Sequence, residues 1–175
     1  MDKFELARIK YKPEIIKYLL VAETPPKLNS NRFFYFENVL EQDSLFLETV
    51  KLLYPKETSQ LDTKEIRHNK SSFLLKFKKD GFYLIDSLDS PFNEKYSSSQ
   101  KIRLITAGQT SLISKINSIV NNDTKVILIS ATVFKADFLF LLQNGIKVIN
   151  KELIDFPGSG GQIKYRFKMN KILNI

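Results

Sequence analysis

Short runs of consecutive apolar residues recur along the chain, each bounded by polar or turn-forming residues. A run of this kind, without alternation, is typical of a strand buried on both faces, as in a parallel sheet. Proline cannot continue a hydrogen-bonded ladder, so the two prolines at 25 and 26 end the first run. We predict four such strands, at 18–22, 82–88, 125–130 and 146–149.

Between these runs, apolar residues follow the 3.6-residue period of helices that pack one face against a sheet. Gly108 either is tolerated inside one of these helices or divides it in two. The last segment also suits a strand, but a helix there completes the α/β alternation. The predicted helices start near Pro13 and cover 43–53, 62–79, 98–121 and 132–144, and a last helix follows the glycine-rich loop, with Lys164, Lys168 and Lys171 on one face.

Strands that alternate with helices predict an α/β protein with three layers, α/β/α, around a short, mostly parallel, four-stranded sheet. A chain of 175 residues fits a single domain, 1–175. No apolar run approaches the ~20 residues of a membrane span. The charged start of the chain lacks the apolar core of a signal peptide, so we expect a cytoplasmic protein with no membrane contact.

The chain has no cysteine and one histidine, His68. Disulfides, iron–sulfur clusters and thiolate zinc sites are therefore excluded, and multi-histidine metal sites and Ser-His-Asp catalysis are nearly excluded. We expect no metal and no cofactor, and we expect His68 to be a surface residue of a helix.

The formal net charge is +8 and the pI is about 9.5. Such a charge favours an anionic partner, above all nucleic acid, because lysine and arginine neutralise phosphates and release counterions. Alternatively, the lysines only keep the protein soluble.

The carboxyl ends of the first two predicted strands carry acidic residues, Glu23 and Asp86, and prolines follow both. The aromatic cluster 33–36 comes after the first loop. Ligands of open α/β sheets bind at this edge of the sheet, so these residues are suited to form a pocket wall. In the alternative interpretation, Glu23 is a solvated charge, the aromatic residues belong to the core, and Asp86 caps the next turn.

The loop 155–162 holds three of the chain's six glycines. Glycines let the backbone approach a phosphate or an extended strand closely. The loop is not a P-loop, because no lysine followed by serine or threonine stands at the required spacing. The N-terminus of the helix after it would favour an anion, and Lys164, Arg166 and Lys168 add positive charge.

The segment Ala22-Glu23-Thr24-Pro25-Pro26, together with the two later strand-end loops, resembles the uracil-DNA glycosylase superfamily. Members have a short parallel sheet between helices and a first-strand loop of the Gly-Glu-Ala-Pro-Gly or Gly-Gln-Asp-Pro-Tyr type. The resemblance covers nearly the whole chain by topology. It implies an enzyme that flips a base out of DNA and hydrolyses its base–sugar N-glycosidic bond, without a metal.

By this resemblance, Glu23 would orient water or stabilise the positive sugar, and Thr24 falls where the other variant has its water-activating aspartate. Asp86 lies where members often have an asparagine that reads the base. The residues that would stack on the flipped base are Phe33, Phe34 or Tyr35. The residues implied in DNA contact are Pro25, Pro26, Ser159, Gly160, Gln162, Lys164, Arg166 and Lys168.

The chain departs from the family in its last loop, which has Asp155 and Phe156 near the position of the histidine that stabilises the leaving base. Asp86 in place of asparagine would also suit a different base edge. The alternative is therefore a non-catalytic relative that binds nucleic acid or a nucleotide through the same cleft. A third alternative, supported by the glycine-rich loop, is an unrelated α/β protein that acts on small phosphorylated ligands.

Overall fold

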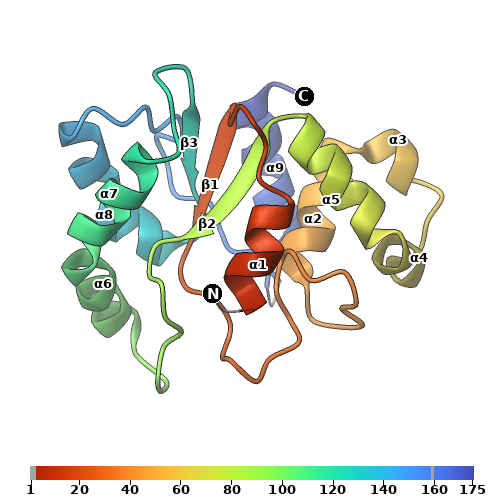
Figure 1. Ribbon diagram of the computed structural model, residues 1–175, viewed down its shortest axis with the longest axis horizontal. Helices are drawn as coiled ribbons and strands as arrows, with labels where there is room; N and C mark the ends of the chain where they lie inside the picture. The colour runs from red at the N-terminus through yellow and green to blue at the C-terminus, as the bar shows by residue number, and fades with distance from the viewer. Residues whose placement is uncertain (1–2, 159) are drawn as a thin grey trace.

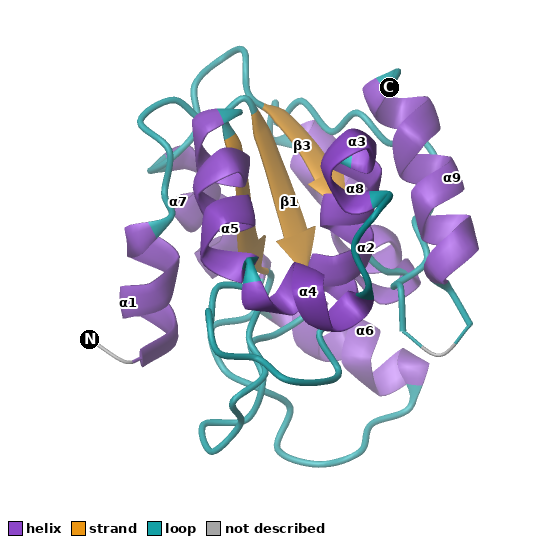
Figure 2. Ribbon diagram, turned by 90° about the vertical axis from the view of Figure 1, so that its right-hand side faces the viewer, coloured by secondary structure: helices purple, strands orange, loops and turns teal. Residues whose placement is uncertain are grey.

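A computed structural model describes residues 3–158 and 160–175 of the chain, and Figures 1 and 2 show three layers with the sheet in the middle. On one side of the sheet lie α6 (Ser98–Ala107), α7 (Gln109–Asn117) and α8 (Ala131–Gln143). On the other side lie α2 (Ser44–Leu53), α5 (Lys70–Lys79) and α9 (Gln162–Leu173). The α/β class and the layered arrangement agree with the sequence pattern.

The central strand is β1 (Tyr18–Ala22), and it pairs in parallel with both β2 (Phe82–Asp86) and β3 (Lys125–Leu128). The bounds of β1 are those predicted, whereas β2 and β3 end at 86 and 128 rather than at 88 and 130. Ala22 is paired with Asp86 in register, and its neighbour Val21 with Leu128. All three strands therefore end at the same edge of the sheet.

The predicted fourth strand, at 146–149, is not formed, because the sheet of the described residues has three strands. The chain does run beside β3 there, with isolated parallel bridges at Val148 and Ile154. Between these bridges the side chain of Asn150 replaces the main chain: its Oδ1 accepts from Leu128 N at 2.9 Å and its Nδ2 donates to Leu128 O at 3.2 Å. At Leu128 an amide side chain thus satisfies the edge of β3 and interrupts the ladder, whereas Val126 makes main-chain hydrogen bonds to Lys147 and Ile149.

Two predicted helices are each divided in two. The segment 62–79 forms α4 (Thr63–His68) and α5, with Asn69 between them, and 98–121 forms α6 and α7, which meet at Gly108. A Cβ atom on Gly108 would lie 2.5 Å from Leu88 Cδ2, so a larger residue would displace Leu88. Of the two sequence interpretations of Gly108, the break is the one observed.

The sequence pattern does not predict α1 (Lys3–Lys10) or the short α3 (Pro55–Thr58), and the helix expected near Pro13 is absent from the described residues. Only a few residues separate Pro13 from β1, too few for a helix and a turn. The helix α1 has a weak apolar face whose one buried residue is Phe4, which packs against Phe33 and Phe36. Tertiary contact, rather than periodicity, holds α1 in place.

Buried apolar side chains from all three layers form one hydrophobic cluster. Gly81 and Gly145, with φ of +84° and +77°, follow the ends of α5 and α8 as predicted. His68 is exposed on α4, also as predicted. Within 3–158 and 160–175, no helix has both the length and the apolar character needed to cross a membrane.

Candidate functional site

The loops that leave the carboxyl edge of the sheet enclose a cavity of about 290 Å³, which we call the rim pocket. Its walls come from the loop after β1, the start of α2, the end of β2 and Phe156. The predicted site residues that line it are Glu23, Thr24, Pro25, Pro26, Phe33, Phe34 and Asp86. Asp43 and Phe46 also line it, and the sequence analysis did not propose either as a site residue.

Glu23 lies where β1 ends, and its side chain is 24% exposed. Its Oε1 accepts a hydrogen bond from Ser130 Oγ at 3.1 Å and another from the hydroxyl of Thr132. Its Oε2 lies 3.3 Å from Lys101 Nζ of α6. The carboxylate is therefore held in place at the sheet edge and does not point into bulk solvent.

The three residues that hold Glu23 were not predicted as site residues. Ser130 and Thr132 directly follow the third strand, so the rule that parallel strands end at one edge could have found them. Lys101 stands within a helix and carries no such signal.

Ser130 has a φ of +88°, which is uncommon for a residue other than glycine. Its Oγ accepts from Val133 N at 3.3 Å, so it caps α8, and it also donates to Glu23. The two hydrogen bonds compensate for the unfavourable backbone conformation. Strained residues of this kind gather at functional sites, where the surroundings hold them in place.

The aromatic wall of the rim pocket consists of Phe33, Phe34, Phe46 and Phe156, of which only Phe156 is exposed. Tyr35 is not among its described lining residues. The Tyr35 hydroxyl is in the core, where it accepts from Leu84 N at 2.6 Å and donates to Leu84 O at 3.1 Å. Burial raises the pKa of Tyr35 well above its ordinary value. The structure thus brings two of the three predicted stacking residues to the pocket.

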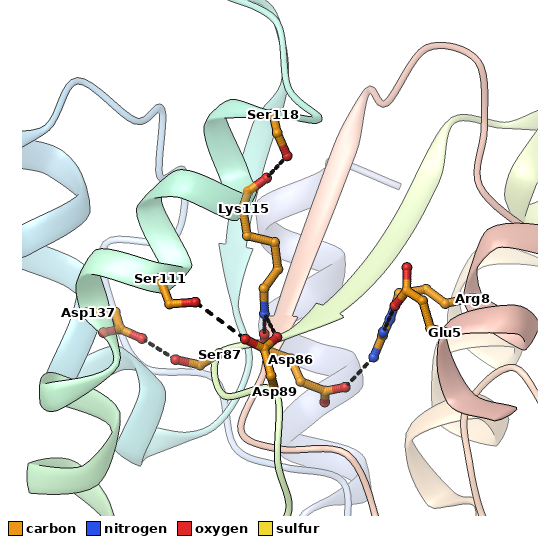
Figure 3. Close-up of polar contacts among 9 residues, drawn as sticks. All are labelled: Glu5, Arg8, Asp86, Ser87, Asp89, Ser111, Lys115, Ser118 and Asp137. Carbon is orange, nitrogen blue, oxygen red and sulfur yellow. Dashed lines mark hydrogen bonds and ion pairs between the residues drawn. The ribbon is translucent and has the colours of Figure 1, made fainter. Parts of the chain in front are cut away.

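Asp86 ends β2, is buried and lines the rim pocket, and Figure 3 shows its side chain directed toward Arg8. Its Oδ2 lies 2.8 Å from an Nη atom of Arg8, which α1 supplies. Burial raises the pKa of the Asp86 carboxyl to about 6, although the charges of Arg8 and Lys115 act in the opposite direction. At neutral pH the group is therefore mostly ionised, and its oxygens only accept hydrogen bonds.

Asp43 precedes α2, but its side chain makes no capping hydrogen bond there. It instead pairs with Arg67 Nε at 2.9 Å and with Lys70 Nζ at 3.5 Å. Lys70 is fully buried, with its Nζ 4.4 Å from the centre of the Phe46 ring. Burial lowers the pKa of Lys70 to about 8, and Asp43 opposes that shift. Asp43 is thus part of a buried ion-pair cluster that supports the pocket wall.

A second, more open cavity of about 550 Å³, which we call the trough, shares Glu23 and Phe156 with the rim pocket. Lys101 and Lys164 line it with the hydroxyls of Ser130 and Thr132, and its second acidic residue is Asp155. The helix α9 begins beside it, and its N-cap residue is Gly161, which has no side chain to accept from the first main-chain N–H groups. Lys101, Lys164 and the start of this helix favour an anion in the trough, whereas the carboxylates of Glu23 and Asp155 oppose it.

The residues predicted to contact DNA divide between the trough and other surfaces. Gly160 and Lys164 line the trough, and Gln162 is the first residue of α9. Ser159 lies outside the residues that the structure describes.

Arg166 and Lys168 are not among the described residues that line the trough, and both are held in ion pairs. Arg166 pairs with Glu48 of α2, and Lys168 Nζ lies 2.8 Å from Asp155 Oδ2. The helix predicted for this segment is confirmed: it places Lys164 and Lys168, four residues apart, on one face and turns Arg166 away from them.

In the described ranges, 3–158 and 160–175, no three His, Cys, Asp or Glu side chains lie together in a way that could hold a metal ion. His68 is not among the described residues that line either cavity. No protein-family model matches the chain, and comparisons with curated proteins and with solved structures also found no match.

Proposed function

We propose that this protein is a divergent uracil-DNA glycosylase-like enzyme, which takes a base flipped out of DNA into the rim pocket and hydrolyses its N-glycosidic bond. The observation that supports this best is that Glu23 lies between an aromatic-walled pocket and a trough that Lys101 and Lys164 help to line. Ligand pockets usually have volumes of about 300–1,000 Å³. At about 290 Å³, the rim pocket is at the small end of this range and suits a single planar heterocycle.

The two cavities fit the two ends of a nucleotide. The rim pocket offers ring faces on which a base can stack, and the trough offers Lys101 and Lys164 for the flanking phosphates. Because Glu23 and Phe156 line both cavities, the sugar that joins base and phosphate would lie against Glu23.

In the proposed reaction the C1′–N bond breaks and its electron pair leaves with the base. Water adds a hydroxyl group to C1′, and the proton it loses is transferred to the leaving base. Positive charge develops on the sugar in the oxocarbenium-like transition state of such reactions. The fixed negative charge of Glu23 stabilises that charge, and its hydrogen bonds to Ser130 and Thr132 hold it in position beforehand.

The choice of base would depend on Asp86. An ionised carboxylate only accepts hydrogen bonds, so it pairs with an N–H edge and repels a carbonyl. A base with an exocyclic amino group is therefore the better substrate than uracil.

The experiment is a measurement of base release from single-stranded and mismatched duplex oligonucleotides that carry different bases, with the free base detected by mass spectrometry. We expect Glu23→Gln to lower the rate by about 10²-fold or more. The matched control is Glu14→Gln, because Glu14 is exposed and precedes β1 at the opposite edge of the sheet. If no base is released from any substrate, or if Glu23→Gln releases base as the parent does, the proposal is rejected.

A second candidate function is binding of nucleic acid or a nucleotide without turnover. It is favoured by the fact that both oxygens of Glu23 already have partners in the structure, in Lys101, Ser130 and Thr132. This candidate predicts salt-dependent binding of oligonucleotides together with no release of base over hours. Release that depends on Glu23 would rule it out.

A further inference from the structure

A groove with a volume of about 770 Å³ runs between the end of α2, the start of α3 and the outer face of α9. It shares no described lining residue with the rim pocket or the trough. Figure 2 shows α9 at one side of the molecule. We call this feature the α2–α9 groove, and neither the fold nor the proposed reaction explains it.

The apolar residues of the groove are unusually exposed. Ile163 is 75% exposed, Phe167 is 72% exposed and Ile175 is 56% exposed. Ile163 and Phe167 are four residues apart, so they lie on one face of α9. The opposite face already supplies the core with Tyr165, Met169 and Leu173. The helix therefore carries a second apolar face that the fold does not use, as is common at sites of protein association.

The polar edge of the groove is positively charged. Lys51, Arg166 and Lys171 line it, and none of its described lining residues is acidic. The buried Glu48 pairs with both Lys51 and Arg166, so one negative charge serves two positive ones. Lys171 pairs with Glu152 at 3.5 Å, but both side chains are exposed, and such a pair is weak. The groove therefore keeps a net positive edge.

These features determine the kind of partner that fits. We propose that the α2–α9 groove binds an amphipathic helix of another protein, with apolar residues on one face and acidic residues beside them. An apolar groove between two helices is a recurring binding surface for such a helix, which inserts residues at i, i+3 or i+4, and i+7. At 1.5 Å per residue, the 12 residues of α9 span about 18 Å, which is enough for about three turns of a bound helix.

Charge argues for an acidic partner over a second copy of this chain. A two-fold contact through the same groove would place Lys51, Arg166 and Lys171 of one copy against those of the other. Opposed like charges are unfavourable at an interface, whereas acidic residues would gain from all three.

The test uses a fluorescent, 18-residue synthetic helix with leucines at i, i+4, i+7 and i+11 and glutamates beside them. Its control has lysine in place of every glutamate. Fluorescence anisotropy is measured with the full chain. We expect saturable binding of the acidic helix, and binding at least tenfold weaker for the basic one, with the difference reduced by salt.

Two variants place the binding in the groove. The double change Ile163→Ser and Phe167→Ser should weaken it at least tenfold, and Lys171→Glu should weaken it several-fold. The matched control is Leu139→Ser, because Leu139 is equally apolar and exposed but lies on α8. Circular dichroism checks that each variant is folded, and base release should be unchanged in all of them. Thus this proposal can fail while the proposed function stands.

Three results would overturn the proposal. One is equal binding of the acidic and the basic helix. Another is unchanged binding by the double variant. The last is a concentration-dependent dimer of the parent, detected by analytical ultracentrifugation, that does not form with the double variant. In that case the groove would bind a second copy of this chain.

Discussion

The hydroxyl of Tyr35 replaces a neighbouring strand at Leu84 of β2: it accepts from the main-chain N–H at 2.6 Å and donates to the main-chain oxygen at 3.1 Å. At the other edge of the sheet, the amide of Asn150 does the same for Leu128 of β3. On each edge of the sheet, a side chain thus satisfies the main-chain groups of one strand residue, Leu84 or Leu128.

We predict that Tyr35→Phe destabilises the fold. The phenyl ring can occupy the same space, but the buried N–H and C=O groups of Leu84 lose their partner. Each buried polar group that loses its hydrogen-bond partner costs about 1–3 kcal/mol. The free energy of unfolding, measured in urea, should therefore fall by at least about 1 kcal/mol. Tyr96→Phe, at a half-buried residue of the loop before α6, is the control and should change the free energy of unfolding by less than about 0.5 kcal/mol. Equal effects of the two changes would contradict this role of Tyr35.

The buried carboxyl of Asp137 should make stability depend on pH. Burial raises its pKa from 3.8 to about 6, although Ser87 Oγ donates a hydrogen bond to its Oδ2 at 2.9 Å. Between these values the unfolded chain has lost a proton that the folded chain still holds, so the free energy of unfolding falls as the pH rises from about 4 to 6 and stays lower above it. The asparagine of Asp137→Asn cannot titrate. The variant should therefore lack the part of the pH-dependent loss in the free energy of unfolding that Asp137 causes, on the order of 2–3 kcal/mol.

This prediction is checked by urea unfolding of parent and variant at pH 4 and pH 7.5. The pKa of Asp86 is raised in the same direction. The free energy of unfolding of the variant should therefore still fall as the pH rises, but by less than that of the parent. Asp123→Asn, a change at an exposed carboxyl, serves as the control. Parallel pH profiles for the parent and Asp137→Asn would show that the carboxyl does not titrate as described.

Lys101 connects Glu23 to the trough, and we predict that it contacts a phosphate when DNA is bound. Lys101→Gln should weaken the binding of a single-stranded oligonucleotide and reduce the slope of log K against log salt by about 1. The control is Lys79→Gln, in the last turn of α5, which should leave the slope unchanged. A slope unaffected by Lys101→Gln would mean that the phosphates bind elsewhere.

Asp86→Asn should change which base is released, if the proposed function holds. The amide offers a donor as well as an acceptor, so bases with a carbonyl edge should gain at least about tenfold relative to bases with an amino edge. Asp89→Asn makes the same chemical change in the adjacent loop, outside the rim pocket, and should leave the preference as it is. Relative initial rates on paired oligonucleotides measure the effect, and an unaltered ratio would show that Asp86 does not read the base.

Much of the framework could be predicted from local pattern. The strand at 18–22 was predicted with its observed bounds, because five consecutive apolar residues, with two prolines shortly after them, allow few other interpretations. The helix at the carboxyl end and the glycines that follow α5 and α8 also depend on neighbouring residues alone. The same strand-end rule predicted Glu23 and Asp86 at the ligand-binding edge of the sheet, and both line the rim pocket.

The parts that could not be predicted depend on residues far apart in the chain. Tyr35 belongs to the same aromatic cluster in the sequence as Phe33 and Phe34. Its hydroxyl, however, forms hydrogen bonds with Leu84, a strand residue 49 positions later in the chain. Arg8 reaches Asp86 from a helix with almost no apolar periodicity. Nothing in the neighbourhood of either residue indicates these partners.

The sequence by itself determined that the chain is a basic α/β protein with an acidic strand end beside prolines and aromatic residues, because these features depend on residue type and on spacing along the chain. Only the tertiary structure decided that the sheet has three strands, that Lys101, Ser130 and Thr132 hold Glu23, and that Tyr35 is in the core. The reason is physical: a buried polar group takes whichever partner folding brings within hydrogen-bond distance, and that partner is fixed by packing in three dimensions.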